Sequence, residues 1–108
     1  MPVKLLVVCF KFKTSQPEYE QIASRLARRM SDVPGLRWKI WLINAAQGKA
    51  GGIYLFDDEH MAQTFLTGPI LTGLRNHVAL TCFALQQFDV LEAATLVTHG
   101  PVREGQQI

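Results

Sequence analysis

Four segments of the chain are rich in aliphatic and aromatic residues, and both alternating sets of positions within them are largely apolar. In the first segment, Leu6 and Val8 belong to one set, and Leu5 and Val7 belong to the other. Alternate side chains of a strand point to opposite faces of a sheet, so strands of this kind are covered on both sides. The pattern predicts strands at residues 3–12, 36–43, 50–56 and 78–90.

Apolar residues with helical spacing occur between these strands. Ser15 and Glu18 form a capping-box pattern, and apolar side chains then recur every three or four positions until Pro34 ends the helix. Asp57 and Asp58 cap a second helix, which is followed by one or two further helical turns.

The predicted order is strand, helix, strand, strand, helix, strand. With right-handed crossovers, this order gives an α+β domain of ferredoxin-like βαββαβ topology with a four-stranded antiparallel sheet. Two helices cover one face of such a sheet, yet the strands are apolar on both faces. An exposed apolar sheet face promotes association, so we expect a second copy of the chain to cover it in a homodimer.

The chain of 108 residues is expected to be a single domain, 1–108, because a second core would have too little chain to bury. A short helix is predicted near residues 91–97, and we expect a flexible tail over about 98–108. Cys9 and Cys82 lie in apolar strand segments without Cys-x-x-Cys spacing, so both are predicted to be buried and reduced.

The net charge of +2 is too small to indicate nucleic acid as a partner, although basic residues are concentrated in the first half of the chain. The N-terminus lacks the pattern of a signal peptide, and no apolar run approaches the roughly 18 residues of a membrane span. We therefore expect a cytoplasmic protein that has no membrane partner.

The histidines and cysteines give no metal-binding pattern. His60, His77 and His99 stand apart from one another, without ligands at the spacing that a metal site requires. No glycine-rich loop follows a strand and opens a helix, so no site for a nucleotide phosphate is indicated. We expect neither a metal nor a cofactor.

Two titratable residues are candidates for chemistry. His77 stands at the start of the last predicted strand, and an unperturbed histidine pKa of about 6.5 suits proton abstraction at neutral pH, so His77 is a candidate catalytic base. The alternative is an ordinary loop histidine in water. Lys39 lies between two tryptophans and is a candidate for attracting an anionic ligand, the alternative being a lysine at a strand edge.

Aromatic residues on the predicted strands form a candidate substrate pocket. Trp38 and Trp41 have opposite parity on one strand, so one indole faces the helices and the other faces the second side of the sheet. The indole that shares a face with Gly52 and Tyr54 gains open space and a phenol, and the pairing register decides which one it is. Phe83 completes the candidate substrate-binding set, for which plain core packing is the alternative.

Short motifs around the predicted hairpin carry a resemblance to a known family. The most specific of them is the run AGGIYLF at residues 50–56. The other motifs are Pro34-Gly35, Trp38-Lys39-x-Trp41, Asp58-Glu59 and Phe88-Asp89-Val90. With these motifs the chain, from the first strand to about residue 90, resembles the YdhR-like mono-oxygenase family of the dimeric α+β barrel superfamily.

The resemblance implies two sheets packed face to face in a dimer, with a ligand cleft between sheet and helices in each subunit. It also implies a cofactor-independent mono-oxygenase acting on a small aromatic substrate of phenol or quinol type, whose ionised form gives an electron to oxygen. Two alternatives stay open for the same fold, namely a non-catalytic protein that binds a small ligand and a lactone isomerase-like enzyme.

Overall fold

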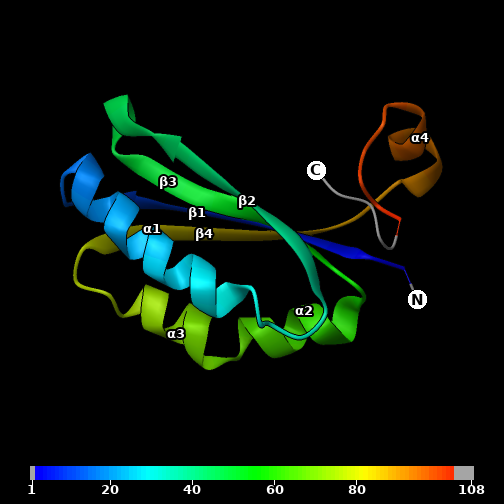
Figure 1. Ribbon diagram of the computed structural model, residues 1–108, viewed down its shortest axis with the longest axis horizontal. Helices are drawn as coiled ribbons and strands as arrows, with labels where there is room; N and C mark the ends of the chain where they lie inside the picture. The colour runs from blue at the N-terminus through cyan, green and yellow to red at the C-terminus, as the bar shows by residue number, and fades with distance from the viewer. Residues whose placement is uncertain (1, 104–108) are drawn as a thin grey trace.

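The expected order of strands and helices is present in the computed structural model, which describes residues 2–103 (Figure 1). The strands are β1 (Lys4–Phe12), β2 (Leu36–Asn44), β3 (Lys49–Phe56) and β4 (Leu80–Asp89). The helices are α1 (Gln16–Met30), the 3-10 turn η1 (Ala45–Gln47), α2 (Glu59–Leu66), α3 (Pro69–Arg75) and α4 (Glu92–Val97). The strands form an antiparallel sheet in the order β2-β3-β1-β4, which confirms the predicted ferredoxin-like α+β fold.

The helices α1, α2 and α3 lie on one face of this sheet and form the main core with it (Figure 1). Both predicted helix starts are capped: Ser15 Oγ accepts from the backbone N–H of Glu18 at 3.3 Å, and Asp58 accepts from that of Met61 at 2.9 Å. The core combines alternate residues of the two central strands with the inner sides of the helices: Leu6, Val8, Phe10, Tyr54, Phe56, Ala62, Phe65, Leu71 and Leu74. No helix within residues 2–103 is long and apolar enough to cross a membrane.

The pairing register decides between the two tryptophans. Trp41 lies directly opposite Gly52. Lys39 lies opposite Tyr54, two positions along the same strands. Both of these pairs therefore lie on the face of the sheet that the helices cover. Trp38 lies on the other face of the sheet. The tryptophan that shares a face with the glycine and the phenol is therefore Trp41.

The C-terminal segment covers one end of the second sheet face. Leu55 and Val102 are buried there in a small apolar cluster of their own. The indole N–H of Trp38 donates to the backbone oxygen of Pro101 at 2.9 Å. The first part of the expected flexible tail thus packs against the sheet, and residues 104–108 lie outside the described residues.

Residues 2–103 leave the remainder of the second face uncovered. Ile40 and Leu42 are 37% and 36% exposed, and Phe88 is 45% exposed. Cys9 and Cys82 are free thiols but both are exposed, so the prediction that they are buried is wrong for the single chain. Cys9 lies on this uncovered face, and Cys82 takes a positive φ of 56° where the pairing of β4 with β1 is irregular.

Two glycines of β3 lie where the strand passes close to its neighbours. A Cβ atom on Gly51 would collide with the backbone carbonyl of Val8 in β1. A Cβ atom on Gly52 would lie 2.5 Å from Cε of Lys39 and 3.1 Å from the backbone oxygen of Ile40. The backbone of a central strand has no room to retreat, whereas the end of a lysine side chain can move. The space left by Gly52 is therefore occupied by Lys39.

Gly51→Ala is expected to destabilise the fold more than Gly52→Ala. The first substitution forces two paired backbones apart and should lower the free energy of unfolding by about 2–3 kcal/mol. The second displaces the flexible end of Lys39 and should lower it by no more than about 1 kcal/mol. Urea unfolding of the two variants measures the difference, and equal losses would contradict this account of the close approach.

Candidate functional site

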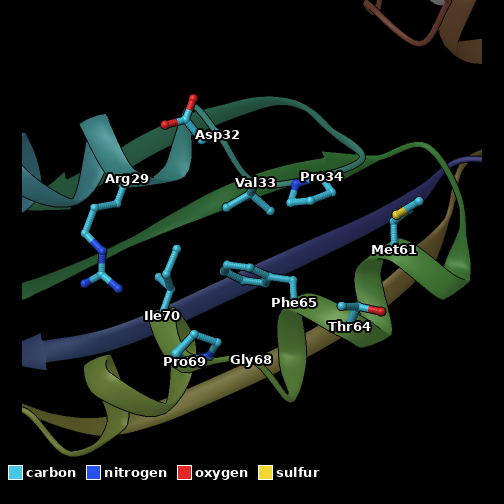
Figure 2. A pocket seen from close by; sticks show the side chains of 10 residues that line it. All are labelled: Arg29, Asp32, Val33, Pro34, Met61, Thr64, Phe65, Gly68, Pro69 and Ile70. Atoms are coloured by element: carbon cyan, nitrogen blue, oxygen red, sulfur yellow. The ribbon is translucent and has the colours of Figure 1, made fainter.

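The helix layer has a mostly apolar cavity of about 250 Å³ that is open to solvent on one side, called the helix cavity below (Figure 2). It lies between the C-terminal end of α1 and the junction of α2 with α3. Its lining is mostly apolar and is completed by three polar side chains: Val33, Pro34, Met61, Phe65, Gly68, Pro69 and Ile70, with Arg29, Asp32 and Thr64. Such a cavity suits a small flat ligand.

Two breaks in the chain create the helix cavity. Pro69 begins α3 shortly after α2 ends, which places Phe65 and Ile70 on either side of the break. On the opposite wall, Gly35 turns the chain into β2 with a φ of +78°, and a Cβ atom there would lie 2.5 Å from the Met61 side chain. The sequence shows both breaks only as ordinary turn signals, so the lining residues were not among the predicted site residues.

Arg29 supplies positive charge beside the helix cavity. Its side chain extends from the last turn of α1 toward Ile70, whereas the carboxylate of Asp32 points away from the cavity (Figure 2). Within residues 2–103, no ion pair involves Arg29. Its guanidinium is therefore available to stabilise an anionic oxygen of a bound ligand.

His77, the predicted catalytic base, lines a second cavity of about 220 Å³ that shares Arg29 and Ile70 with the helix cavity. The Nδ1 atom of His77 accepts a hydrogen bond from the backbone N–H of Ala79 at 3.1 Å. A neutral imidazole whose Nδ1 accepts carries its proton on Nε2. The nitrogen left without this backbone contact is Nε2.

The hairpin of β2 and β3 gathers three of the predicted pocket residues around a lysine, an arrangement called the Lys39 site below. The Nζ atom of Lys39 lies 3.3 Å from the ring centroid of Trp41 and 4.5 Å from that of Tyr54. It also lies 3.2 Å from Sδ of Met30 at the end of α1. The missing side chain of Gly52 leaves the space that Cε of Lys39 fills.

Burial without a counter-charge changes the protonation of the Lys39 site. Burial lowers the pKa of Lys39 from 10.5 to about 7, and it raises the pKa of the Tyr54 phenol. In the described part of the chain, no carboxylate lies within salt-bridge distance of Lys39. The neighbouring cation Arg37 is paired with Asp57 at 2.6 Å. At neutral pH the Lys39 amine therefore exists in both the charged and the neutral form.

Lys39 borders a groove of about 330 Å³ between α1 and β2, called the edge groove below because β2 is an edge strand. Its walls mix apolar and polar side chains: Ala27, Met30, Ser31, Leu36, Arg37, Trp38, Lys39 and Trp41. Met30 and Trp41, the two residues closest to the Lys39 amine, also line this groove.

The remaining predicted residues lie elsewhere. The indole N–H of Trp38 is engaged on the second sheet face, as described above. The ring of Phe83 packs against that of Phe10, with 5.0 Å between centroids, and belongs to the main core. The predicted site residues are thus divided among the Lys39 site, the second sheet face, the core and the cavity beside His77. Residues 2–103 contain no group of three or more His, Cys, Asp or Glu side chains placed to hold a metal.

Several solved structures share this architecture. SnoaB from Streptomyces nogalater, a cofactor-independent oxygenase, has a TM-score of 0.67 at 20% identity over 83% of this chain and 94% of its own. The haem-degrader MhuD from Mycobacterium tuberculosis has a TM-score of 0.63 at 18% identity, over 83% and 96%. NE2512 from Nitrosomonas europaea has a TM-score of 0.65 at 22% identity, over 84% and 91%. The chain therefore shares the ferredoxin-like α+β fold of these structures.

The sequence match is more specific than the fold. Residues 5–101 match the model of the family described as "Putative mono-oxygenase ydhR", and the chain belongs to this family. The resemblance predicted from the hairpin motifs is thus confirmed. None of the curated proteins compared with the chain matches it significantly. The helix cavity and the Lys39 site both lie within the matched residues.

The low pKa of Lys39 makes the stability of the protein depend on pH. In the unfolded chain the amine keeps its proton up to about pH 10.5, whereas in the folded chain it loses the proton above about pH 7. Unfolding between these values takes up a proton, so the free energy of unfolding should rise from about pH 7 to about pH 10. Lys39→Met removes the amine and should abolish this rise in urea unfolding experiments. Lys49→Met, at an exposed lysine of β3, should leave it intact.

Proposed function

We propose that this protein is a cofactor-independent mono-oxygenase whose substrate is a small aromatic compound of phenol or quinol type bound in the helix cavity. The observation that carries the proposal is an apolar cavity with Phe65 in its wall and Arg29 beside it, free of ion pairs within residues 2–103. Apolar walls with few polar groups suit a flat aromatic ligand. The mono-oxygenase name of the family and the fold shared with the oxygenase SnoaB support the reaction class.

The reaction requires the substrate to lose a proton before it reacts with oxygen. Arg29 would stabilise the phenolate form and thereby lower the pKa of the bound phenol. The substrate anion then gives electrons to O₂. Where a ring CH₂ becomes C=O, one oxygen atom of O₂ enters the product, and the other leaves as water with the two hydrogens of the CH₂. The apolar walls would reduce the contact of the bound anion with water and so strengthen its interaction with the guanidinium.

His77 would act from the adjoining cavity. Because Nδ1 is engaged by Ala79, the free Nε2–H is suited to donate a hydrogen bond to a substrate oxygen. We propose this donor role for His77, with the proton of the substrate passing to solvent water. Trp41, Gly52 and Tyr54 would then serve the Lys39 site and would not contact this substrate.

The second candidate function is non-catalytic binding of a small ligand in the same cavity. The observation that favours it is that the helix cavity offers no base to its ligand. Among the described residues that line the cavity, the carboxylate of Asp32 points away, and no other side chain is a base (Figure 2). A binding protein requires no base. A lactone isomerase-like enzyme does require one, so this alternative receives less support from the cavity.

Oxygen uptake by metal-free protein tests the proposed reaction. With hydroxylated anthrones and naphthohydroquinones as substrates, the protein should consume oxygen faster than a protein-free control. Ile70→Trp should fill the cavity and abolish the uptake, since Ile70 lies in its wall. Arg29→Gln should lower kcat/KM by about tenfold or more, because the phenolate loses its cation.

Arg28→Gln serves as the matched control, since Arg28 is the neighbouring arginine on α1 and does not line the helix cavity. It should retain full activity. If no phenol or quinol raises oxygen uptake, while the same compounds bind wild-type protein and fail to bind Ile70→Trp, the non-catalytic alternative is the correct one.

We also propose that two copies of the chain associate through the uncovered part of the second sheet face. Ile40, Leu42 and Phe88 expose apolar surface there, beside an end of the sheet that the chain's own C-terminal segment covers. Apolar patches of this kind mark protein interfaces. A two-fold arrangement would pack the same surface of each copy against the other.

Two isoleucines of β2 give a paired test of the dimer. Ile40 lies on the second sheet face, whereas Ile43, which is 45% exposed, lies on the opposite face. Ile40→Asp should convert a dimer to monomers in sedimentation equilibrium at micromolar concentration, because a charge would be buried in the interface. Ile43→Asp should leave the dimer intact. A folded monomeric wild-type protein would refute the proposed association.

A further inference from the structure

The surroundings of Lys39 point to a second chemical site that the proposed oxygenase reaction does not use. We propose that Lys39 is a nucleophilic amine that forms an imine with an aromatic aldehyde or ketone entering through the edge groove. The Lys39 site and the helix cavity are lined by different residues, so this inference stands or falls separately from the proposed oxygenase reaction.

The neighbours of the Lys39 amine are two aromatic rings and a thioether sulfur, none of which carries a charge. Nζ of Lys39 lies 3.3 Å from the Trp41 ring centroid, 4.5 Å from that of Tyr54 and 3.2 Å from Sδ of Met30. A charged ammonium has three N–H donors, for which oxygen acceptors are the usual partners. In contrast, Lys4 on β1 has its amine 2.7 Å from a carboxylate oxygen of Asp89. Among residues 2–103, no carboxylate pairs with Lys39, and a carboxylate is the partner that normally holds a lysine in its charged form.

Within residues 2–103, the charged and titratable groups around the site supply no counter-charge for an ammonium. The guanidinium of Arg37 on β2 lines the edge groove but is engaged by Asp57 and by the backbone oxygen of Val102. From β3 comes the phenol of Tyr54, which burial keeps neutral by raising its pKa. From α1 come Met30, Ala27 and Ser31, which carry no charge. A lysine pKa of about 7 agrees with these surroundings.

The edge groove gives an aromatic carbonyl compound access to the amine. The groove has a volume of about 330 Å³, and Met30, Leu36 and Trp41 contribute apolar walls against which a ring can lie. Lys39 contributes to the same lining, together with Trp41 and Met30, the two residues that its amine contacts most closely. Desolvated lysines with a lowered pKa are the ones that form Schiff bases in enzymes.

The covalent step is balanced without any further reactant. The lone pair of the neutral Nζ attacks the carbonyl carbon, and the carbonyl π electrons move to oxygen. Proton transfer from nitrogen to oxygen gives a carbinolamine, which loses water to form the C=N bond. Amine and aldehyde are thus converted to imine and water, with no change in oxidation state.

Reductive labelling tests the proposal. The protein is incubated with benzaldehyde and sodium cyanoborohydride near neutral pH, and the benzylated lysines are identified by mass spectrometry of peptides. At pH 7 an amine with a pKa of about 7 is about half neutral, whereas a lysine of ordinary pKa is neutral in only about one molecule in 3,000. We expect Lys39 to be labelled at least about tenfold faster than the exposed Lys11, Lys13 and Lys49.

Two substitutions on α1 test the role of the missing counter-charge while keeping the lysine. Ala27 is exposed and lines the edge groove, so Ala27→Glu places a carboxylate beside the amine and should slow labelling of Lys39 about tenfold. Ser24 lies one turn earlier and does not line the groove, so Ser24→Glu should leave the labelling rate unchanged.

Two results would overturn the inference. In protein whose circular dichroism shows an intact fold, labelling of Lys39 no faster than that of Lys11 would show that the amine is not activated. The second result is a ratio of labelling rates, Lys39 to the exposed lysines, that is the same for propanal as for benzaldehyde. This would refute an aromatic ligand, because the walls of the edge groove would then contribute nothing to binding of the ring.

Discussion

The antiparallel pairing of β3 with both β1 and β2 is the constraint on which the rest of the structure depends. β3 is bonded to a strand on each side, and its side chains point alternately to two apolar faces of the sheet. Each of these faces therefore needs its own cover. The helices cover one face, and the segment around Val102 covers one end of the other. The two glycines of β3 serve this pairing differently: Gly51 permits the close approach of β1, and Gly52 admits the side chain of Lys39. The helix cavity lies where the end of α1 meets the junction of α2 with α3. The Lys39 site lies where Gly52 of β3 has no side chain.

Much of the fold could be predicted because local signals and long-range packing agree. The cap formed by Ser15, the cap at Asp58 and the double apolar character of the strands each identified an element, and the structure has all of them. The element order then restricted the topology to very few arrangements. The cover of the second face was harder to foresee. The sequence of the C-terminal segment shows no strong pattern, yet its Pro101 carbonyl accepts the indole N–H of Trp38.

The candidate sites could be predicted only in part, because they depend on register and on the contact of distant segments. The sequence showed that Trp38 and Trp41 face opposite ways, but only the pairing with Gly52 shows which of them borders the Lys39 site. Lys39 appeared as a strand-edge lysine, since its depth depends on α1 and on the position of Met30. The helix cavity combines the ends of three helices, each of which gives only a turn signal in the sequence.

Lys39 occupies a place where an apolar side chain would be more stable. The rings of Trp41 and Tyr54 attract the charged form, and such contacts contribute about 0.5–2 kcal/mol. Burial nevertheless lowers the pKa to about 7, so the rings do not compensate for the lost hydration. A methionine or leucine would fill the space beside Gly52 without this loss. Sequences depart from the rule that buried charges are paired chiefly at functional sites, where the unfavourable energy is offset by the rest of the fold. The energetic disadvantage of an amine at this position is therefore itself an argument that the amine performs chemistry.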